Sequence, residues 1–561
     1  MSAMSMREEP LPRLTWATVG DVVLIAVGAL VCLLPALGGT NLWDPDEPRF
    51  AEATRQMIAR GDYLTPYFND APRWEKPILL YWAQALLFRM AGDSEWAARA
   101  PAAFAAVGCA LLIYLLGRTL FTRRAALLAS GMWLSTFRFV TYARQGLTDV
   151  PVLCFVLAAM LGFTRAVLGG DPRWVWVAWT AVGLGVLTKG PIGLLPCLVI
   201  AVWLLVMRDW RSLARLRWLA GSVLAAGIAA PWYLFEIALH GWRFIALHFG
   251  YEVITRAVSS KFAGPTRGPL FYLKILPGEI VPWTLLVGAA VVWAVVTWRR
   301  MSRDDRASVA LLAVWSLGVL ALFSAARYKL PHYTLPAYPP LLIAAGAFVD
   351  ATANGAPGWS RALRGTLAAT AAVVALICAV LAALLWWLFS FDLLGTTLLV
   401  LLAVGAGLAA LQSARLSRAL GVVVCVAALL YPVVAWRWSD EIAGHFQAAQ
   451  ALGRTTATIA PAGAPLASTL LHPSLVYYAR RPVRFLQSPD EVVQFLAEPS
   501  RRYLVLSCRD VEPTIDRAGT PLRVVARQPV FSPRLGHLLD GRMMTPANEL
   551  CLVMRPRKYP K

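Results

Sequence analysis

The sequence has few charged residues for its length. Only 15% of its 561 residues are Asp, Glu, Lys or Arg, whereas a water-soluble domain usually carries about a quarter. Hydrophobic residues make up 58% of the chain, and the mean hydropathy is +0.58. This composition excludes an ordinary soluble protein and requires long apolar segments.

Several functional motifs are also missing. The chain has no Gly-rich phosphate loop, no dinucleotide-binding fingerprint and no His-Glu-x-x-His zinc pair, which argues against a soluble nucleotide substrate. No soluble segment carries a basic stripe with interleaved aromatic residues, so the net charge of +21 does not indicate nucleic-acid binding. A cleavable signal peptide of the usual form is absent, and the apolar stretch from Asp21 to Leu37 is expected to be a retained first span.

Apolar runs of membrane-spanning length dominate the sequence. A helix needs about 17–25 mostly apolar residues to cross a bilayer. We predict about thirteen such spans, with centres near residues 28, 110, 132, 158, 182, 198, 228, 288, 315, 342, 378, 402 and 427. The fifth and sixth are short and meet at Thr188-Lys189-Gly190-Pro191.

The segments between these spans alternate in charge. Arginine and lysine collect on the cytoplasmic side of membrane proteins. The basic set contains Arg118, Arg123, Arg124, Arg165, Arg173, Arg208, Arg211, Arg215, Arg217, Arg299, Arg300, Arg303, Arg306, Arg361, Arg364, Arg415 and Arg418. The opposite set includes residues 38–100 and 239–280 and the short segments near Asp149 and Lys329. We predict a multi-pass protein of the bacterial inner membrane, with the opposite set and the C-terminal tail on the periplasmic face.

The C-terminal part of the chain differs in composition. Residues 440–561 are richer in polar residues, with strand-like runs at 503–507 and 550–554 and a capped helical segment at 488–497. We predict a transmembrane domain over residues 1–439 and a small soluble α/β domain over 440–561. Cys508 and Cys551 lie at the two strand-like runs and are predicted to form a disulfide in the oxidising periplasm. The other six cysteines lie in apolar spans, where cysteine acts as a small hydrophobic residue.

Acidic residues gather in the first outer segment. Asp44, Asp46 and Glu47 precede a helical pattern from Phe50 to Ala59, where a helix N-terminus favours negative charge. For Asp44 and Glu47 we expect helix capping by solvated acids, whereas for Asp46 we expect a role in chemistry.

The same segment continues to Glu75-Lys76-Pro77, at the mouth of the next apolar helix. A carboxylate beside an ammonium group at a membrane boundary suits a phosphate together with a metal ion or a sugar. The alternative is a surface ion pair.

Further ionisable residues lie on the predicted outer face. Asp149 stands at the rim of the helix bundle, where an ionisable group is costly and is therefore a functional candidate. Additional candidates are Glu252, Arg256, Arg267, Lys329 and Tyr333. Carboxylates and cations on one face indicate a substrate with an apolar tail and an anionic leaving group.

These motifs resemble, in this order, those of the GT-C superfamily of membrane glycosyltransferases that use polyprenyl-phosphate sugars. The similarity is greatest to the bacterial transferases that add 4-amino-4-deoxy-L-arabinose to lipid A and to their protein-mannosyltransferase-like relatives. The matching pieces are Asp46-Glu47 with Arg49, Glu75-Lys76-Pro77, Thr148-Asp149, Arg267-Gly268-Pro269 and Lys329-Leu-Pro-His-Tyr333.

The resemblance implies roles for several residues. Asp46 would be the catalytic or acceptor-positioning carboxylate, with Asp149 as a second catalytic candidate. Lys76, Arg267 and Tyr333 would bind the polyprenyl phosphate. Further substrate contacts are expected from Glu75, Glu252, Arg256 and Lys329.

A metal requirement is left open by the resemblance. Glu75 would contact a divalent metal ion or an aminosugar. Relatives often have histidines where this chain has Val253 and Thr266, which leaves His248 as the stand-in metal ligand.

We therefore expect a glycosyltransferase that moves a sugar from undecaprenyl phosphate to a lipid A phosphate, without a nucleotide. One alternative is the same chemistry with a protein or another glycan as acceptor. Another is a flippase for the lipid-linked sugar. A flippase would need polar residues along a path through the midplane, whereas the ionisable groups here gather at one rim.

Overall fold

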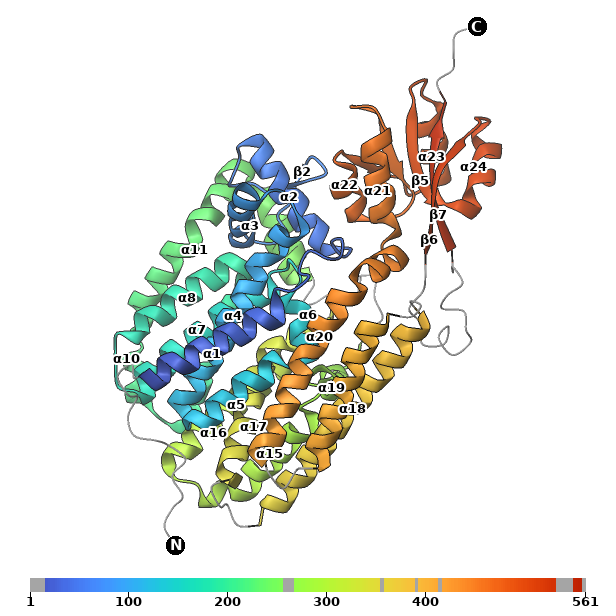
Figure 1. Cartoon of the computed structure of the whole chain (residues 1–561). Helices are drawn as coiled ribbons and strands as arrows, with labels where there is room; N and C mark the ends of the chain where they lie inside the picture. The colour runs from blue at the N-terminus through green and yellow to red at the C-terminus, as the bar shows by residue number, and fades with distance from the viewer. Residues whose placement is uncertain are drawn as a thin grey trace. The chain divides into compact units, whose positions relative to one another are not determined.

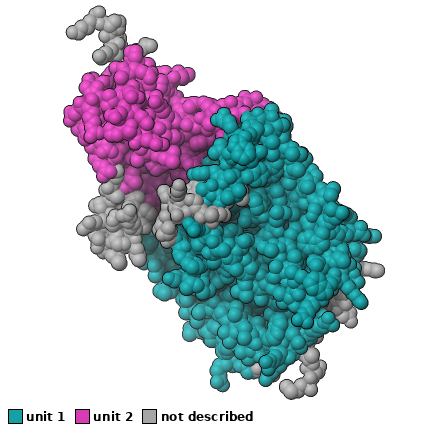
Figure 2. Space-filling view, turned by 180° about the vertical axis from the view of Figure 1, so that it is seen from behind, with its two compact units in different colours: residues 1–35, 74–80, 100–434 teal, residues 36–73, 81–99, 435–561 magenta. Residues whose placement is uncertain are grey.

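The computed structural model describes residues 16–255, 267–353, 358–388, 392–411, 416–530 and 548–556 (Figure 1). Chain contacts divide the protein into two compact units (Figure 2). Unit 1 comprises Met1–Pro35, Trp74–Leu80 and Ala100–Val434, and unit 2 comprises Ala36–Arg73, Tyr81–Arg99 and Ala435–Lys561. The predicted domain boundary at residues 439/440 falls within helix α20 (Leu416–Phe446) and stays a prediction.

Apolar helices account for most of the described chain. Eight are long and apolar enough to cross a membrane: Glu95–Leu120 (α4), Asp149–Leu168 (α7), Trp174–Met207 (α8 with α9), Trp218–His240 (α11), Arg303–Ala325 (α16), Ser360–Leu388 (α18), Leu393–Leu411 (α19) and Ala419–Phe446 (within α20). A bent pair, Phe271–Glu279 (α14) and Thr284–Arg300, would make a ninth. The multi-pass architecture is thus present, while the number of thirteen spans stays a prediction.

Every predicted span centre nevertheless falls within a helix. The centres outside those eight helices lie in α1 (Trp16–Leu33), α5 (Arg123–Leu134), α15 (Thr284–Thr297) and α17 (Tyr338–Ala353). These helices are shorter than the eight, or are counted only as part of the bent pair.

The segment Trp174–Met207 is interrupted between α8 (Trp174–Lys189) and α9 (Leu195–Met207). Gly190 has a φ of +64° and leads into the short helix η1 (Gly190–Leu194). A Cβ atom on Gly193 would lie 2.2 Å from the backbone nitrogen of Val186, although a straight helix would separate these residues by about 10 Å. Only glycine fits such a close approach, and Lys189 is the last residue of α8 before this interruption.

Unit 2 contains a five-stranded mixed sheet. Its strand order is β4 (Val483–Phe485), β3 (Leu466–Ser468), β5 (Arg502–Ser507), β7 (Asn548–Arg555) and β6 (Arg523–Val530). β3 pairs in parallel with β4 and β5, whereas β7 pairs antiparallel with β5 and β6. The predicted strands at 503–507 and 550–554 are confirmed as β5 and β7.

Alternating side chains of β5 cover both faces of this sheet. Tyr503 and Val505 pack with α21 (Ala448–Ile459) and α22 (Pro473–Ala479). Leu504 and Leu506 pack with α23 (Pro489–Ala497) and α24 (Val511–Ala518). The small C-terminal α/β sheet domain is therefore present, with helices on both faces.

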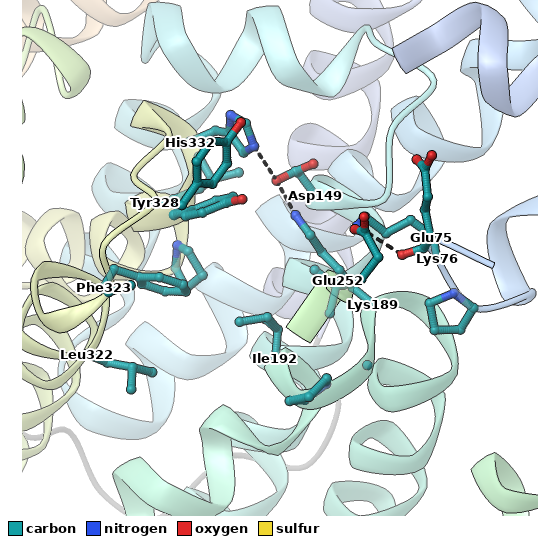
Figure 3. Close-up of a pocket in the computed structure, with 18 of the residues that line it drawn as sticks. Glu75, Lys76, Asp149, Lys189, Ile192, Glu252, Leu322, Phe323, Tyr328 and His332 are labelled. Carbon is teal, nitrogen blue, oxygen red and sulfur yellow. Dashed lines mark hydrogen bonds and ion pairs between the residues drawn. The ribbon is translucent and has the colours of Figure 1, made fainter. Parts of the chain in front are cut away.

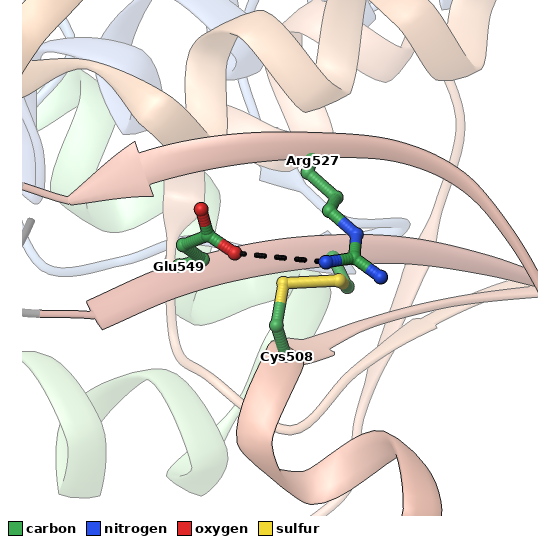
Figure 4. Close-up of a disulfide and its surroundings, with 4 residues drawn as sticks. Cys508, Arg527 and Glu549 are labelled. Carbon is green, nitrogen blue, oxygen red and sulfur yellow. Dashed lines mark ion pairs between the residues drawn. A yellow bond between two sulfur atoms is a disulfide. The ribbon is translucent and has the colours of Figure 1, made fainter.

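The predicted disulfide is confirmed. Cys508, in the turn η5 (Cys508–Asp510) after β5, is bonded to Cys551 of β7 across 43 residues of sequence (Figure 4). Leu506 pairs with Cys551 in the β5–β7 ladder, so Cys508 follows that pair by two residues. The nearby Arg527–Glu549 ion pair, at 4.0 Å, links β6 to β7.

The predicted capped helices are also present. Ser488 caps α23, and its hydroxyl accepts a hydrogen bond from the Glu491 backbone nitrogen at 3.2 Å. The helical pattern of the first outer segment forms α2 (Asp46–Arg60), which ends at Gly61 in the left-handed conformation.

Candidate active site

Unit 1 contains a cavity of about 600 Å³. Its ionisable lining comprises Glu75, Lys76, Asp149, Lys189, His248, Glu252, Tyr328, His332 and Tyr333. Ile192, Leu322 and Phe323 contribute apolar surface to the same cavity (Figure 3). All of these residues come from segments that the charge pattern predicts to end on the outer face.

Asp149 and Lys189 form the central ion pair of this cavity. Lys189 Nζ donates a 2.6 Å hydrogen bond to Asp149 Oδ1, and the two side chains are only 14% and 11% exposed. Asp149 is the first residue of α7, and Lys189 is the last residue of α8. Each charge therefore complements its own helix dipole.

His332 lies on the other side of Asp149 (Figure 3). Its Nε2 atom is 3.6 Å from Asp149 Oδ1, and its Nδ1 atom is 3.3 Å from the hydroxyl of Tyr142 in α6 (Phe137–Ala143). The short helix η4 (Pro331–Ala337) positions His332 and its neighbour Tyr333. Asp149 is thus held between two nitrogen groups from different helices.

Lys76 faces a second carboxylate. Lys76 Nζ lies 3.4 Å from Glu252 Oε2 and donates to the Glu75 carbonyl oxygen at 3.1 Å. Glu252 and His248 belong to η2, a π-helix over Ala246–Thr255. These residues are four positions apart, so they lie on the same side of the helix and line the same cavity.

His248 is buried and held in one tautomer. Because a carbonyl oxygen can only accept, Nδ1 carries the proton of its 2.6 Å hydrogen bond to the Trp74 carbonyl. Nε2 is buried and has no hydrogen-bond partner in the described residues. Burial lowers the pKa of His248, and nearby Lys76 lowers it further. A neutral imidazole with an available Nε2 is suited to ligate a metal ion.

A complete metal site does not follow from these residues. Glu75 and His248, the two candidate ligands from the sequence, line the same cavity. Among the described residues, no group of three His, Cys, Asp or Glu side chains is arranged to hold a metal ion. We therefore derive no step through a metal, and its requirement stays a prediction.

Aromatic rings form one wall of the cavity. Tyr333 packs against Phe323 at 5.5 Å and Tyr328 at 6.4 Å between ring centroids. Lys189 Nζ lies 5.8 Å from the centroid of the Tyr333 ring. Tyr333 therefore adjoins a cation of the central ion pair, and its contact with a phosphate stays a prediction.

Two of the predicted cations lie beside each other but are not among the residues that line this cavity. Arg267 donates a 3.0 Å hydrogen bond to the Lys329 carbonyl oxygen and stacks on Phe271 at 4.4 Å. Lys329 is buried, and its ammonium group donates to the Ala326 carbonyl. Arg256 lies outside the described residues. The substrate-binding roles of these three residues stay predictions.

Three acidic residues of the first outer segment, Asp44, Asp46 and Glu47, belong to unit 2. Asp46 is half exposed, at 52%, and its Oδ1 atom lies 3.9 Å from Arg49 Nη1. Glu47 is buried rather than solvated and accepts two hydrogen bonds from Arg99, at 2.8 and 2.9 Å. Asp44 accepts a 2.8 Å hydrogen bond from the Ser474 backbone nitrogen at the start of α22. The solvated state expected for Glu47 was therefore wrong, because Arg99 pairs with it in the interior.

Sequence reasoning missed two prominent members of the cavity, Lys189 and His332. Lys189 was noted only as part of a break between two apolar runs, and His332 only within a longer motif. A lysine between two apolar helices is itself a functional signal, because an ionisable group within a membrane span is costly. His332 carried no comparable signal.

The comparisons with known proteins agree with the sequence resemblance. Residues 75–235 match the family described as dolichyl-phosphate-mannose-protein mannosyltransferase. The undecaprenyl phosphate-alpha-4-amino-4-deoxy-L-arabinose arabinosyl transferase of Pseudomonas aeruginosa PAO1 is 34% identical over 339 residues, which cover 58% of this chain and 58% of that protein. An uncharacterized protein of Aquifex aeolicus is 27% identical over 331 residues, covering 58% and 64% of the two chains. The matches thus span about three-fifths of the relatives' own length.

Solved structures show the same fold over nearly the whole chain. ArnT from Cupriavidus metallidurans, bound to undecaprenyl phosphate, superposes with a TM-score of 0.76 at 21% identity and covers 97% of this chain and 100% of that one. The oligosaccharyltransferase AglB from Archaeoglobus fulgidus gives a TM-score of 0.52 at 13% identity, covering 90% and 70%. The chain therefore has the GT-C fold, and its resemblance to the polyprenyl-phosphate-sugar glycosyltransferases, including the aminoarabinose transferases, is confirmed.

Proposed function

We propose that the protein is a glycosyltransferase that moves a sugar, 4-amino-4-deoxy-L-arabinose, from undecaprenyl phosphate to a lipid A phosphate. The reaction would take place at the periplasmic face of the bacterial inner membrane. The donor and its sugar rest on the names of the relatives, whereas the lipid A acceptor rests on the resemblance of the sequence motifs.

The observation that carries the proposal is the combination of charges in one partly apolar cavity. Two ammonium groups, Lys76 and Lys189, line it together with the carboxylates of Asp149 and Glu252. Ile192, Leu322 and Phe323 line the same cavity. A lipid phosphate needs both kinds of surface, since cations hold its phosphate and apolar side chains hold its tail.

The cations would act on the leaving group. During transfer, the bond between the sugar's anomeric carbon and the donor phosphate oxygen breaks, and its electron pair leaves with the phosphate. A new bond forms between that carbon and an acceptor oxygen. Lys76 and Lys189, already positioned by their carboxylate partners, would stabilise the growing negative charge where water is partly excluded. Arg267 is a third candidate for this role.

The carboxylates would act on the sugar and the acceptor. A lipid A phosphate is already nucleophilic, so Asp46 would then orient the groups and stabilise positive charge on the sugar ring. A hydroxyl acceptor would need a general base to take its proton, and Asp46 would serve as that base. Asp149, held between Lys189 and His332, would keep the Lys189 ammonium oriented toward the donor.

Membrane orientation is part of the proposal. Each cavity segment belongs to the set that alternates with the basic segments, so the positive-inside rule puts the cavity on the periplasmic face. Labelling of single-cysteine variants at residues 46 and 76 with a membrane-impermeant reagent tests this. Reaction only after the membrane is permeabilised would refute the proposed orientation.

Mass spectrometry of lipid A tests the function itself. Cells that express the gene are expected to carry a pentosamine on the lipid A phosphates, and cells that lack it are not. Unchanged lipid A, accompanied by loss of a sugar from a protein or another glycan, would select the alternative acceptor. Purified protein that releases undecaprenyl phosphate only in the presence of one acceptor then identifies that acceptor directly.

A further inference from the structure

Unit 2 has a cavity of its own, of about 330 Å³. Its charged lining consists of four arginines and two carboxylates: Arg55, Arg60, Arg480, Arg481, Glu52 and Asp70. Its walls come from α2, from the turn between β1 (Tyr67–Phe68) and β2 (Ala71–Pro72), and from the end of α22. None of these residues lines the cavity of unit 1.

Two of the arginines, Arg55 and Arg481, are held by hydrogen bonds to backbone carbonyl oxygens. Arg481 donates hydrogen bonds to the carbonyl oxygens of Ala460 at 3.1 Å and Ala464 at 3.2 Å. Arg55 is mostly buried and donates to the Tyr477 carbonyl at 3.0 Å. Both guanidinium groups are therefore fixed by the protein itself.

The neighbouring turn is also held in place. Asn69 donates from Nδ2 to the Val483 carbonyl at 2.9 Å and accepts from the Val483 backbone nitrogen at 2.8 Å. This reciprocal pair joins the β1–β2 turn to β4, one residue after Pro482 of the cavity wall. The cavity is thus built on a preorganised backbone.

The other two arginines extend toward solvent. Arg60 is 40% exposed and donates to Asp70 at 2.8 Å, and Arg480 is 66% exposed and donates to Asp93 at 3.3 Å. Each guanidinium group has five N–H donors, so one carboxylate contact leaves donors for a second anion.

The carboxylates do not neutralise this cluster. Burial raises the pKa of Glu52 to about 7, against a lowering effect of Arg55. Glu52 nevertheless forms an ion pair with Arg55, which also lies 3.8 Å from Asp93. Four guanidinium groups thus face three carboxylates, Glu52, Asp70 and Asp93, so the cavity has an excess of positive charge.

We propose that this cavity binds a phosphomonoester group. Paired guanidinium forks match the oxygens of a phosphate geometrically, and arginine is preferred over lysine where such planar recognition is needed. Arg60 and Arg480 would contact the phosphate, while Arg55 and Arg481 would hold the wall in place. The phosphate belongs either to a lipid head group or to a free ion. The proposal does not depend on the transfer reaction.

Residue-resolved protection from chemical modification tests this site. The full chain in phosphatidylcholine nanodiscs is treated with phenylglyoxal, which reacts with guanidinium groups, and modified peptides are quantified by mass spectrometry. One arm adds inorganic phosphate, and a second replaces part of the lipid with phosphatidic acid, whose head group is a phosphomonoester. Chloride keeps the ionic strength constant, because exposed charges are screened by salt.

Arg60 and Arg480 are expected to react about tenfold more slowly when phosphate is present at about ten times its dissociation constant. Arg509, which is 78% exposed in η5, serves as the matched control and should react at an unchanged rate. Protection by phosphatidic acid alone assigns the site to a lipid head group, and protection by inorganic phosphate alone assigns it to the free ion. If neither arm slows Arg60 and Arg480 more than Arg509, the proposal is refuted, whatever the transfer activity.

Discussion

Lys189 and Asp149 are 40 residues apart in the sequence, yet the lysine ammonium donates a 2.6 Å hydrogen bond to the aspartate carboxylate. The last residue of α8 and the first residue of α7 meet in this pair. Both charges are mostly buried, so neither has bulk water as an alternative partner. The pair therefore supports the fold of the cavity and supplies a cation to it.

We predict that the substitutions D149N and K189Q each lower both thermal stability and sugar transfer. Loss of one partner of a buried pair leaves an uncompensated charge, which costs roughly 3–5 kcal/mol. The double variant removes both charges and should recover most of the stability but not the activity. Thermal unfolding and transfer assays on the three variants separate the effects, with K274Q at an exposed lysine as control. Recovery of full activity in the double variant would reduce the pair to a structural role.

We predict that D46N lowers sugar transfer by about 10²–10⁴ if the acceptor is a hydroxyl, because a general base contributes about that factor. With a phosphate acceptor the loss should be smaller, since no proton needs to be removed. The measurement is the transfer rate in vesicles, with D516N, at an exposed aspartate of α24, as the matched control. Unchanged transfer in D46N with both acceptors would contradict a role of Asp46 in the transfer reaction.

Replacing Lys76 or Arg267 by Gln should weaken donor binding more than acceptor binding, because both are proposed to contact the phosphate that leaves. A hydrogen bond to a charged group contributes about 1.5–3 kcal/mol, so donor affinity should fall at least about tenfold. Titration with undecaprenyl phosphate measures this for each variant, and K274Q again serves as the control. Donor affinity that stays unchanged in both variants would place the phosphate elsewhere.

Removal of the Cys508–Cys551 disulfide should destabilise unit 2. Closing a 43-residue separation restricts the unfolded chain and contributes roughly 2–5 kcal/mol. We expect the C508S/C551S variant to unfold at a lower temperature than wild type. Reductant should lower the melting temperature of wild type by a similar amount. The C425S variant, at an exposed free cysteine, should respond to reductant as wild type does. A melting temperature that is unaffected by both changes would contradict this prediction.

Glu52 should make stability depend on pH. Its folded-state pKa is raised to about 7 from an ordinary value of 4.5, with burial as the main cause and Arg55, Gln56, Asp70 and Asp93 as the groups facing it. Between these two values the unfolded chain loses the proton while the folded chain keeps it, so ionisation is linked to unfolding. The contribution of Glu52 to stability should therefore be greatest below pH 4.5. It should fall by about 1.4 kcal/mol for each pH unit up to about pH 7 and then level off.

Thermal unfolding of wild type and E52Q across this pH range tests the prediction. The E52Q variant should lack this component of the pH dependence, whereas E512Q, at an exposed glutamate of α24, should retain it. Identical pH profiles for wild type and E52Q would show that Glu52 ionises as an ordinary glutamate.

Several features were predictable because their signals are local. Apolar runs placed a helix at every expected span centre, since only a helix satisfies its backbone hydrogen bonds within an apolar segment. Short apolar runs marked β5 and β7, and the positions of Cys508 and Cys551 at these runs predicted the disulfide. The Ser488 cap of α23 was also predictable, because its partner Glu491 is only three residues away.

Other features depended on contacts between distant segments and carried no local signal. Glu47 was expected to be solvated, but its partner Arg99 lies 52 residues further along the chain. Lys189 lies in a break between apolar runs, and no residue near it in the sequence indicates that it pairs with Asp149. The arginine cavity of unit 2 likewise combines α2 with residues that follow it by more than 400 positions.

The sequence by itself determined that this is a multi-pass helical protein with a small α/β domain, and that charged residues collect on one face of its spans. Helix formation, span length and charge asymmetry depend on neighbouring residues and on the bilayer. Only the tertiary structure decided which of those charges share a cavity, because pairing depends on how the helices pack. It joined Asp149 to Lys189 and Lys76 to Glu252, and it gathered four arginines from both ends of the chain into a second electropositive cavity.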